Sequence, residues 1–240
     1  MRIDKFIAEK GTYTRSRVAL LVKEGAVSVN GKTVKAPSYD VSENDFIEID
    51  NSFIKYVSRG GLKLEYALDF WGIDPSGLKA VDIGASTGGF TDVLLMRGTK
   101  CVYAIDSGSD QLAHKLKNDE RVVSVEGFNA REMTTEITNG ECDIAVCDLS
   151  FISQTLIYPA LTRVLKKGGI FITLIKPQFE VGRSLVGKGG IVRDERARED
   201  SVQRVIDTAK NYGLSFRGRT VSPIKGGDGN TEYLAFFIYE

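Results

Sequence analysis

The sequence predicts a mixed α/β fold in which a small α+β module precedes a larger, mainly parallel sheet with helices on both faces. Three observations predict it. Short apolar strands alternate with helical segments over residues 79–176, as in proteins whose parallel strands are joined by crossover helices. The first 50 residues instead show two short helices and a hairpin. The last two strands, at residues 214–221 and 232–239, are joined by a link too short for a crossover, so we expect them to pair antiparallel.

The N-terminal module begins with two short helices, over residues 2–11 and 15–25. Thr14 can cap the second helix, and a glycine ends each of them. Asn30 and Gly31 separate two runs of alternating apolar residues, which is a strong signal for a hairpin. The module ends with a short strand at residues 46–50 and a connector at residues 51–57.

The larger domain opens with a helix at residues 58–72, whose apolar stripe contains Leu62, Tyr66, Leu68 and Trp71. Its first five strands are predicted at residues 79–84, 101–106, 122–127, 142–149 and 169–176. Helices are predicted between these strands at residues 89–98, 109–119, 130–137 and 153–167, and a long helix follows at residues 196–213.

Charge and composition narrow the function classes. Lys and Arg together number 32, as do Asp and Glu, but residues 1–35 carry eight basic side chains against three acidic ones, which favours an anionic partner for this module. The three cysteines form no CxxC pair and His114 is the only histidine, so we expect neither a disulfide framework nor a metal site. No apolar run approaches the roughly 20 residues of a membrane span, and the N-terminus lacks a secretory signal. A cytoplasmic protein is expected.

The turn after the first strand of the larger domain, VDIGASTGGFTD at residues 81–92, is built from small residues. Such a turn lets backbone N–H groups approach a ligand at the N-terminus of the next helix. Asp106 ends the following strand, where a carboxylate can accept hydrogen bonds from both hydroxyls of a ribose. A purely structural tight turn is the alternative. The candidate cofactor-binding residues of this region are Asp82, Gly84, Ser86, Gly88, Gly89 and Asp106.

Four ionisable residues are candidates for catalysis: Lys63, Asp148, Lys176 and Glu232. Asp148 and Lys176 end two predicted apolar strands, and the carboxyl ends of strands line the ligand crevice of an open α/β sheet. Taken alone, Lys63 is equally well explained as a solvated helix residue, and Glu232 as a charge at a strand edge.

The ordered motifs identify a family resemblance. They are SRGGLKL, VDIGASTGGFTD, CDLSF, KPQFE and GNTEY. This series resembles the TlyA, or hemolysin A-like, ribosomal RNA 2′-O-methyltransferases, which belong to the FtsJ-like methyltransferases. The resemblance implies an S4-type RNA-binding domain at residues 1–56 and a methyltransferase domain at residues 57–240, with a Rossmann-like sheet and an antiparallel C-terminal strand.

The same resemblance implies S-adenosylmethionine as cofactor, with Asp148 and Asn129 as further contacts. Asn129 departs from the pattern of many FtsJ-like enzymes, which have an acidic residue here for the adenine. A Lys-Asp-Lys-Glu tetrad is implied as well. Lys176 is hypothesised to be the general base for the ribose hydroxyl, positioned by Asp148, with Lys63 and Glu232 completing the network. Pro177 restricts Lys176 to extended geometry and so aims its amine.

The residues after the fourth strand bear on the substrate. Enzymes that methylate base nitrogens commonly have an Asn/Asp-Pro-Pro-aromatic element there, whereas this chain has Asp148-Leu149-Ser150-Phe151. Ribose is therefore favoured over base methylation, the second candidate. Phe151 is expected either to stack on a base or to pack in the core. A non-catalytic ribosome assembly factor is a further alternative. A membrane-active haemolysin is disfavoured, because the most apolar segments have the length of strands.

RNA contact is expected at the basic module and at one loop. The candidate RNA-binding residues are Arg15, Arg17, Lys23, Lys32 and Arg59. A solvated charged surface is the alternative for these side chains. The glycine-rich and basic segment at residues 181–198 is expected to order over bound RNA or to be a plain connection. Ribosomal RNA or a ribosomal subunit is the expected partner.

Overall fold

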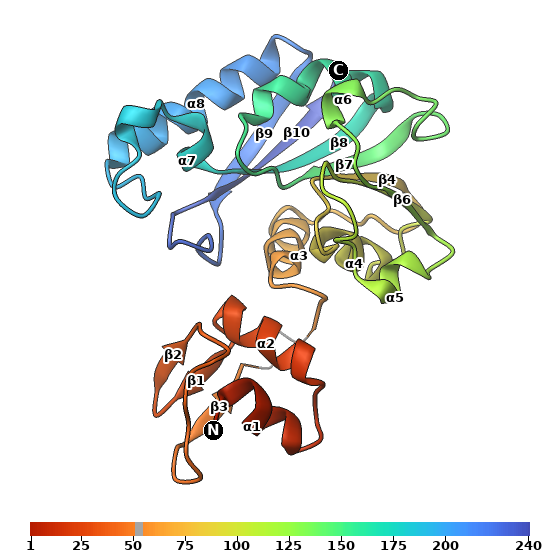
Figure 1. Ribbon diagram of the computed structural model, residues 1–240. Coiled ribbons are helices and arrows are strands. Elements are labelled where there is room, and N and C mark those ends of the chain that lie inside the picture. The colour runs from red at the N-terminus through yellow and green to blue at the C-terminus, as the bar shows by residue number, and fades with distance from the viewer. Residues whose placement is uncertain (51–54) are drawn as a thin grey trace. The chain divides into compact units, whose positions relative to one another are not determined.

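The computed structural model describes residues 1–50 and 55–240 (Figure 1). Two compact units make up the chain, Met1–Arg59 and Gly60–Glu240. Part of the expected connector, residues 51–54, lies outside the described residues. None of the helices within the described ranges combines the length and apolar character that a membrane span requires.

The N-terminal unit has the expected mixed composition. Its elements are α1 (Ile3–Glu9), α2 (Arg15–Glu24), β1 (Val27–Val29), β2 (Lys32–Val34) and β3 (Ile47–Ile49), with strand order β2-β1-β3. The Thr14 hydroxyl accepts a hydrogen bond from the Arg17 N–H (3.3 Å) and caps α2. Asn30 and Gly31 both have positive φ, at 51° and 75°, and they turn β1 into β2 as predicted.

The larger unit contains a seven-stranded sheet of order β6-β5-β4-β7-β8-β10-β9. Its strands are β4 (Lys79–Ile83), β5 (Cys101–Ile105), β6 (Val122–Val125), β7 (Cys142–Cys147), β8 (Leu165–Ile175), β9 (Leu214–Val221) and β10 (Tyr233–Tyr239). The first five are parallel, whereas β10 runs antiparallel between β8 and β9. The Rossmann-like sheet with an antiparallel C-terminal strand is therefore confirmed.

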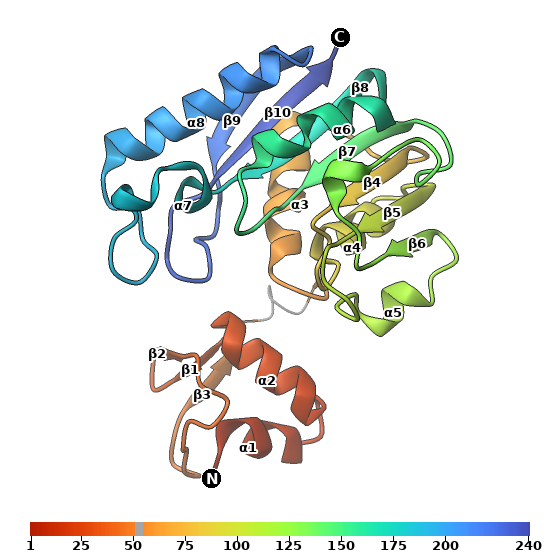
Figure 2. The ribbon, with the colours of Figure 1, turned by 45° about the horizontal axis from the view of Figure 1, so that its top comes forward.

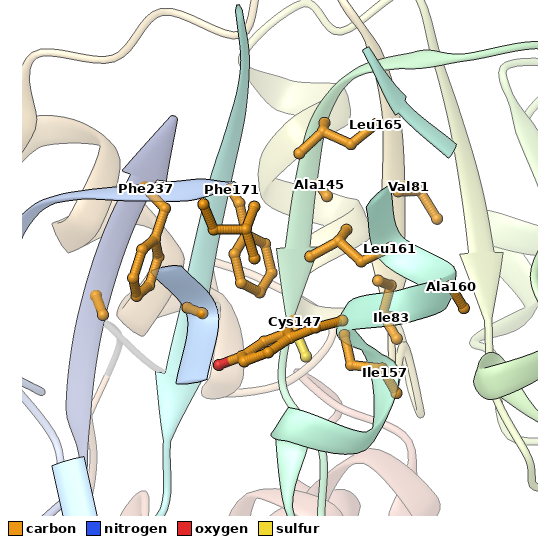
Figure 3. Close-up of a cluster of buried hydrophobic side chains, with 14 of the residues drawn as sticks. Val81, Ile83, Ala145, Cys147, Ile157, Ala160, Leu161, Leu165, Phe171 and Phe237 are labelled. Atoms are coloured by element: carbon orange, nitrogen blue, oxygen red, sulfur yellow. The ribbon is translucent and has the colours of Figure 1, made fainter. Parts of the chain in front are cut away.

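Helices cover both faces of this sheet (Figures 1 and 2). They are α3 (Gly60–Trp71), α4 (Gly89–Met96), α5 (His114–Lys117), α6 (Tyr158–Val164), α7 (Pro177–Glu180) and α8 (Glu195–Lys210). The main core lies between the sheet and α6 and α8. Figure 3 shows Phe171 of β8 beside Phe237 of β10, with Ile157 and Leu161 packed nearby. Burial of these side chains fixes the strand order, which brings the ends of β4, β5, β7 and β8 together.

Several predicted helices are shorter than expected. The segment 109–119 is helical only at α5, because the backbone N–H groups of Gln111 and Leu112 donate to the Glu126 carboxylate. Segment 130–137 retains a single 3-10 turn. The helix expected to run to residue 167 ends at Val164, since β8 begins at Leu165, which pairs with Cys142 of β7.

Candidate active site

A pocket of about 410 Å³ lies at the carboxyl ends of β4, β5 and β7. Five predicted cofactor residues line it, namely Gly84, Ser86, Asp106, Asn129 and Asp148. The remaining lining residues, which sequence reasoning did not assign to the cofactor site, are Ile105, Ser107, Gly108, Gln111, Phe128, Ala130, Leu149, Ser150, Phe151 and Ile152. Most of them directly follow a strand, and this adjacency is the signal that could have identified them.

The turn after β4 requires glycine at Gly84. Its φ is +83°, and a Cβ there would lie 2.6 Å from the Asp148 carbonyl oxygen. Gly88 has φ +93°, and a Cβ there would collide with the Leu116 side chain. The turn therefore leaves no room for side chains on its inner side, and its backbone lies directly against the segment that carries Asp148.

Asp106 shapes the pocket wall at the end of β5. Its Oδ2 accepts from the Ser86 N–H (2.8 Å) and its Oδ1 accepts from the Gly108 N–H (2.7 Å). Each carboxylate oxygen can accept a second hydrogen bond. The carboxylate is thus held in one orientation while it lines a pocket of nucleoside size, which fits the ribose contact expected from the sequence.

Asp82 lies beneath the turn and does not line the pocket. Its Oδ2 accepts from the N–H (2.9 Å) and the hydroxyl (2.7 Å) of Thr91, which ties β4 to the first turn of α4. Its Oδ1 has no hydrogen-bond partner within residues 1–50 and 55–240. Burial, together with the nearby carboxylate of Asp148, raises the pKa of Asp82 to about 7. Gly88 and Gly89, at the start of α4, likewise lie outside the pocket lining.

Two side chains that follow β6, Asn129 and Glu126, accept hydrogen bonds beside the pocket. The Asn129 Oδ1 accepts from the N–H and the Nε of Arg131, both at 3.2 Å, and lines the pocket as an amide. Glu126 fixes the segment of Gln111 by accepting from two backbone N–H groups. The N–H of Leu112 and the Lys117 ammonium hold the pKa of Glu126 at about 2.

The four catalytic candidates form two ion pairs. Lys176 Nζ lies 2.6 Å from Asp148 Oδ1 and also donates to the Ser150 hydroxyl (2.8 Å). Lys63 Nζ lies 2.6 Å from Glu232 Oε2, and these two side chains are only 7% and 2% exposed. Asp148 lines the pocket, so the first pair stands at its edge.

Strand register brings the two pairs to the same edge of the sheet. Tyr233 of β10 pairs with Ile175 of β8, so the next residues outward, Glu232 and Lys176, follow directly at neighbouring strand ends. Gln178 strengthens this connection, because its Nε2 donates to Glu232 Oε1 (3.3 Å). Sequence reasoning missed Gln178, although it lies within the KPQFE motif.

The backbone of Lys176 is extended, with φ −110° and ψ 100°, and Pro177 begins α7 immediately after it. The extended geometry expected from the Lys-Pro sequence is therefore confirmed. The proline also needs no hydrogen-bond acceptor at the first position of α7. The chain can thus turn sharply behind the amine and leave Lys176 at the end of the strand.

Phe151 stands at the rim of the pocket and is 87% exposed. The expectation that it packs in the core is wrong for this reason. Its φ is +69°, which is unusual for a bulky side chain. Its ring centroid lies 5.2 Å from that of Phe179 on α7. Together the exposed ring of Phe151 and the half-buried ring of Phe179 form an aromatic surface beside the Lys176–Asp148 pair.

The basic residues of the N-terminal unit differ in their contacts. Arg15 pairs with the buried Asp4 (3.2 Å), and Arg17 donates to the carbonyl oxygens of Val57 and Tyr56 (both 3.1 Å). Although burial alone would raise it, the pKa of Asp4 is lowered by Arg2 and Arg15. Two of the candidate RNA-binding arginines thus also hold the unit together. The other candidates are Lys23 and Lys32, which are exposed, and Arg59, which is half-buried.

The side chain of Asn230 attaches the segment 181–198 to the loop before β10. Asn230 is 2% exposed. Its Oδ1 accepts from the Val192 N–H (3.0 Å), and its Nδ2 donates to the Gly190 carbonyl (2.8 Å). The segment therefore meets the loop that leads into Glu232.

Known proteins match nearly the whole chain. A family model described as FtsJ-like methyltransferase matches residues 56–239, and an S4 domain model matches residues 1–47. The chain is 46% identical over 240 residues to "Hemolysin A" of Brachyspira hyodysenteriae, covering 99% of this chain and 100% of that protein. It is 41% identical over 235 residues to "16S/23S rRNA (cytidine-2'-O)-methyltransferase TlyA" of Mycobacterium tuberculosis, covering 97% of this chain and 88% of that protein.

Solved structures give the same fold. A protein of Streptococcus thermophilus whose description also refers to hemolysin superposes with a TM-score of 0.80 at 41% identity, covering 100% of this chain and 88% of that one. Aeropyrum pernix fibrillarin, solved with bound S-adenosyl-L-methionine, superposes with a TM-score of 0.52 at 16% identity, covering 82% and 80% of the two chains. The expected S-adenosylmethionine-dependent methyltransferase fold is confirmed.

Proposed function

Since the chain belongs to the FtsJ-like methyltransferase family, we propose that it transfers a methyl group from S-adenosylmethionine to a ribose 2′-hydroxyl of ribosomal RNA. The resemblance to TlyA and hemolysin A proteins, and with it the enzyme class, is confirmed. The single observation that carries the proposal is the Lys176–Asp148 ion pair at the edge of the pocket, with the buried Lys63–Glu232 pair beside it.

The pocket fits the proposed cofactor. Gly84 lines the pocket with backbone that carries no side chain, and the fixed carboxylate of Asp106 suits the two hydroxyls of a ribose. Phe128 and Ile105 give the pocket apolar surface against which a base can pack. The Asn129 amide lines the same pocket and can form a hydrogen bond to that base. S-adenosylmethionine supplies a methyl group already activated by the sulfonium. The protein must therefore align the hydroxyl and remove its proton.

We assign the proton transfer to Lys176. Its amine stands at the end of β8, where it forms an ion pair with the Asp148 carboxylate and donates a hydrogen bond to the Ser150 hydroxyl. In its neutral form, Lys176 Nζ accepts the proton of the 2′-hydroxyl as the oxygen takes the methyl group. Asp148 orients the amine before and after this transfer.

Lys63 and Glu232 act as a rigid support in this proposal. Both are buried, and Gln178 joins Glu232 to the chain directly after Lys176. Neither side chain needs to exchange a proton with the substrate. Their role is to hold the neighbouring strand ends, and so the general base, in a fixed place.

RNA recognition is assigned to both units. The division into Met1–Arg59 and Gly60–Glu240, with family matches at residues 1–47 and 56–239, supports an S4-type domain at 1–56 and a methyltransferase domain at 57–240. The exposed Lys23 and Lys32, with Arg15, Arg17 and Arg59, supply positive charge for phosphates. The Phe151–Phe179 surface provides a stacking platform for a nucleotide base. A ribosomal substrate implies a cytoplasmic location.

The test is to incubate the purified protein with labelled S-adenosylmethionine and ribosomal subunits, digest the RNA to nucleosides, and identify the methylated product. A 2′-O-methylnucleoside is expected. A methylated base would instead establish base methylation, the runner-up that the exposed Phe151 also accommodates. Absence of any labelled nucleoside with both subunits would favour a non-catalytic assembly factor.

A further inference from the structure

Glu180 is a largely buried carboxylate that the proposed chemistry does not use. It ends α7, four residues after Lys176. Its Oε2 accepts from the Ser153 hydroxyl (2.6 Å), and its Oε1 accepts from the Gln154 N–H (2.9 Å). Burial raises the pKa of Glu180. A carboxylate that accepts two short hydrogen bonds from one segment is a strong local attachment, because charge-assisted bonds are the stronger kind.

These bonds connect the two segments that form the edge of the site. One is residues 148–154 after β7, and the other is residues 176–180 after β8. Lys176 meets Asp148 and Ser150 where the segments leave the sheet. Phe179 contacts Phe151 in the middle. Glu180 holds the far end, so the two segments and their contacts form a closed ring.

The ring explains how Phe151 keeps its backbone conformation. A positive φ is costly for an aromatic residue and persists only where the surroundings enforce it. Phe151 is too exposed for core packing to enforce it. Two residues later, Ser153 is bound to Glu180, while three residues earlier Asp148 is bound to Lys176. The strained residue is thus fixed from both sides.

We propose that Glu180 is a positioning residue for methyl transfer, which holds residues 148–154 so that Ser150 and Asp148 orient the Lys176 amine and Phe151 stands at the rim. This inference rests on the proposed function and adds a residue to it. Glu180 acts through Lys176 and Phe151 and does not touch the reacting atoms.

The test compares four variants of the full-length protein on ribosomal subunits: Glu180→Ala, Glu180→Gln, Ser153→Ala and the control Asp143→Ala. Asp143 is a matched carboxylate that lies away from the site, near the amino end of β7. It accepts a hydrogen bond from the Lys79 N–H (2.8 Å) and forms an ion pair with Lys166. Glu180→Ala is expected to lower kcat/KM about 100-fold, mainly through kcat, as for a misplaced catalytic group. Ser153→Ala should lie between Glu180→Ala and the parent.

Glu180→Gln should restore activity to within roughly 5-fold of the parent, because the amide can accept from the Gln154 N–H and donate to the Ser153 hydroxyl. Hydrogen exchange over residues 149–155 should accelerate in Glu180→Ala and remain slow in Asp143→Ala. Hydrogen exchange is measured without RNA, so it can be compared even for a variant that has no methyltransferase activity. A general loss of stability would affect Glu180→Ala and Asp143→Ala alike.

Two results would overturn the positioning role. One is a Glu180→Ala enzyme whose kcat equals that of Asp143→Ala. The other is a Glu180→Gln enzyme as impaired as Glu180→Ala, since the charge and not the hydrogen bonds would then matter. Failure of the proposed function looks different. The parent protein would then yield no 2′-O-methylnucleoside, while exchange over residues 149–155 would still show whether Glu180 holds the segment.

Discussion

The ammonium of Lys63 lies 2.6 Å from the carboxylate of Glu232, although 169 positions separate them in the sequence. Both are buried, so removal of one partner leaves an uncompensated charge in a site of low dielectric. Lys63→Met or Glu232→Gln alone should lower the free energy of unfolding by about 3–5 kcal/mol. The double variant should lose less than the sum of the two. Urea denaturation of all four proteins measures the coupling, and strict additivity would contradict it.

Lys176→Ala should reduce methyl transfer by about 10²–10⁴-fold, which is the range for loss of a general base. Cofactor binding should survive, because Lys176 does not line the pocket. Single-turnover transfer and calorimetric titration with S-adenosylmethionine measure the two quantities. The exposed Lys100 provides a matched control as Lys100→Ala. Substantial turnover by Lys176→Ala would exclude Lys176 as the base.

Asp82 should make stability depend on pH. Its pKa is about 7 in the folded protein, against the ordinary value of 3.8 that applies to the unfolded chain. Between these two pH values the folded protein therefore keeps a proton that the unfolded chain has lost. This contribution is fully present below pH 3.8 and is lost as pH rises through about 7. Asp82→Asn keeps the acceptor for Thr91 and cannot ionise.

The stability of Asp82→Asn relative to the parent should therefore increase between pH 5 and pH 8, by at most about 3 kcal/mol at roughly 1.4 kcal/mol per pKa unit. Urea unfolding at several pH values measures it. Glu180, whose pKa is also raised, is present in both proteins and cancels in the difference. A difference that stays constant with pH would show that Asp82 is already ionised in the folded state.

Asn230→Ala should release the segment 181–198 from the loop before β10. The variant loses both hydrogen bonds, to Val192 and Gly190, and leaves the buried Val192 N–H unsatisfied, at about 1–3 kcal/mol. Trypsin should then cut faster after Lys188 and Arg193, and mass spectrometry identifies the sites. Asn211→Ala, at the end of α8, is the control. Equal cleavage rates in the two variants would mean that Asn230 does not hold the segment.

Much of the site could be predicted because its determinants are local. Asp148 and Lys176 follow apolar runs, and parallel strands place their carboxyl ends at one edge. The small residues around Gly84 predict a tight turn, and the ordered motifs indicate the family. Pro177 likewise constrains Lys176 through its own ring, so this geometry could be stated without a structure.

Other features depended on contacts that no local pattern encodes. From local sequence alone, Glu232 is equally well explained as a charge at a strand edge. In the fold, β10 lies between β8 and β9, and this places Glu232 beside the strand end of Lys176 and in contact with Lys63. Asp82 lies under the turn and not in the pocket, because its carboxylate is taken by Thr91.

The sequence by itself therefore determined which segments become strands and turns, since side-chain periodicity and glycine or proline act within a few residues. Tertiary structure decided that Glu232 pairs with Lys63 and that Asp82 lies beneath the turn instead of lining the pocket. Those outcomes follow from packing between segments distant in sequence, such as the Glu180 attachment to Ser153 across 27 positions, and packing is fixed only when the whole core is buried.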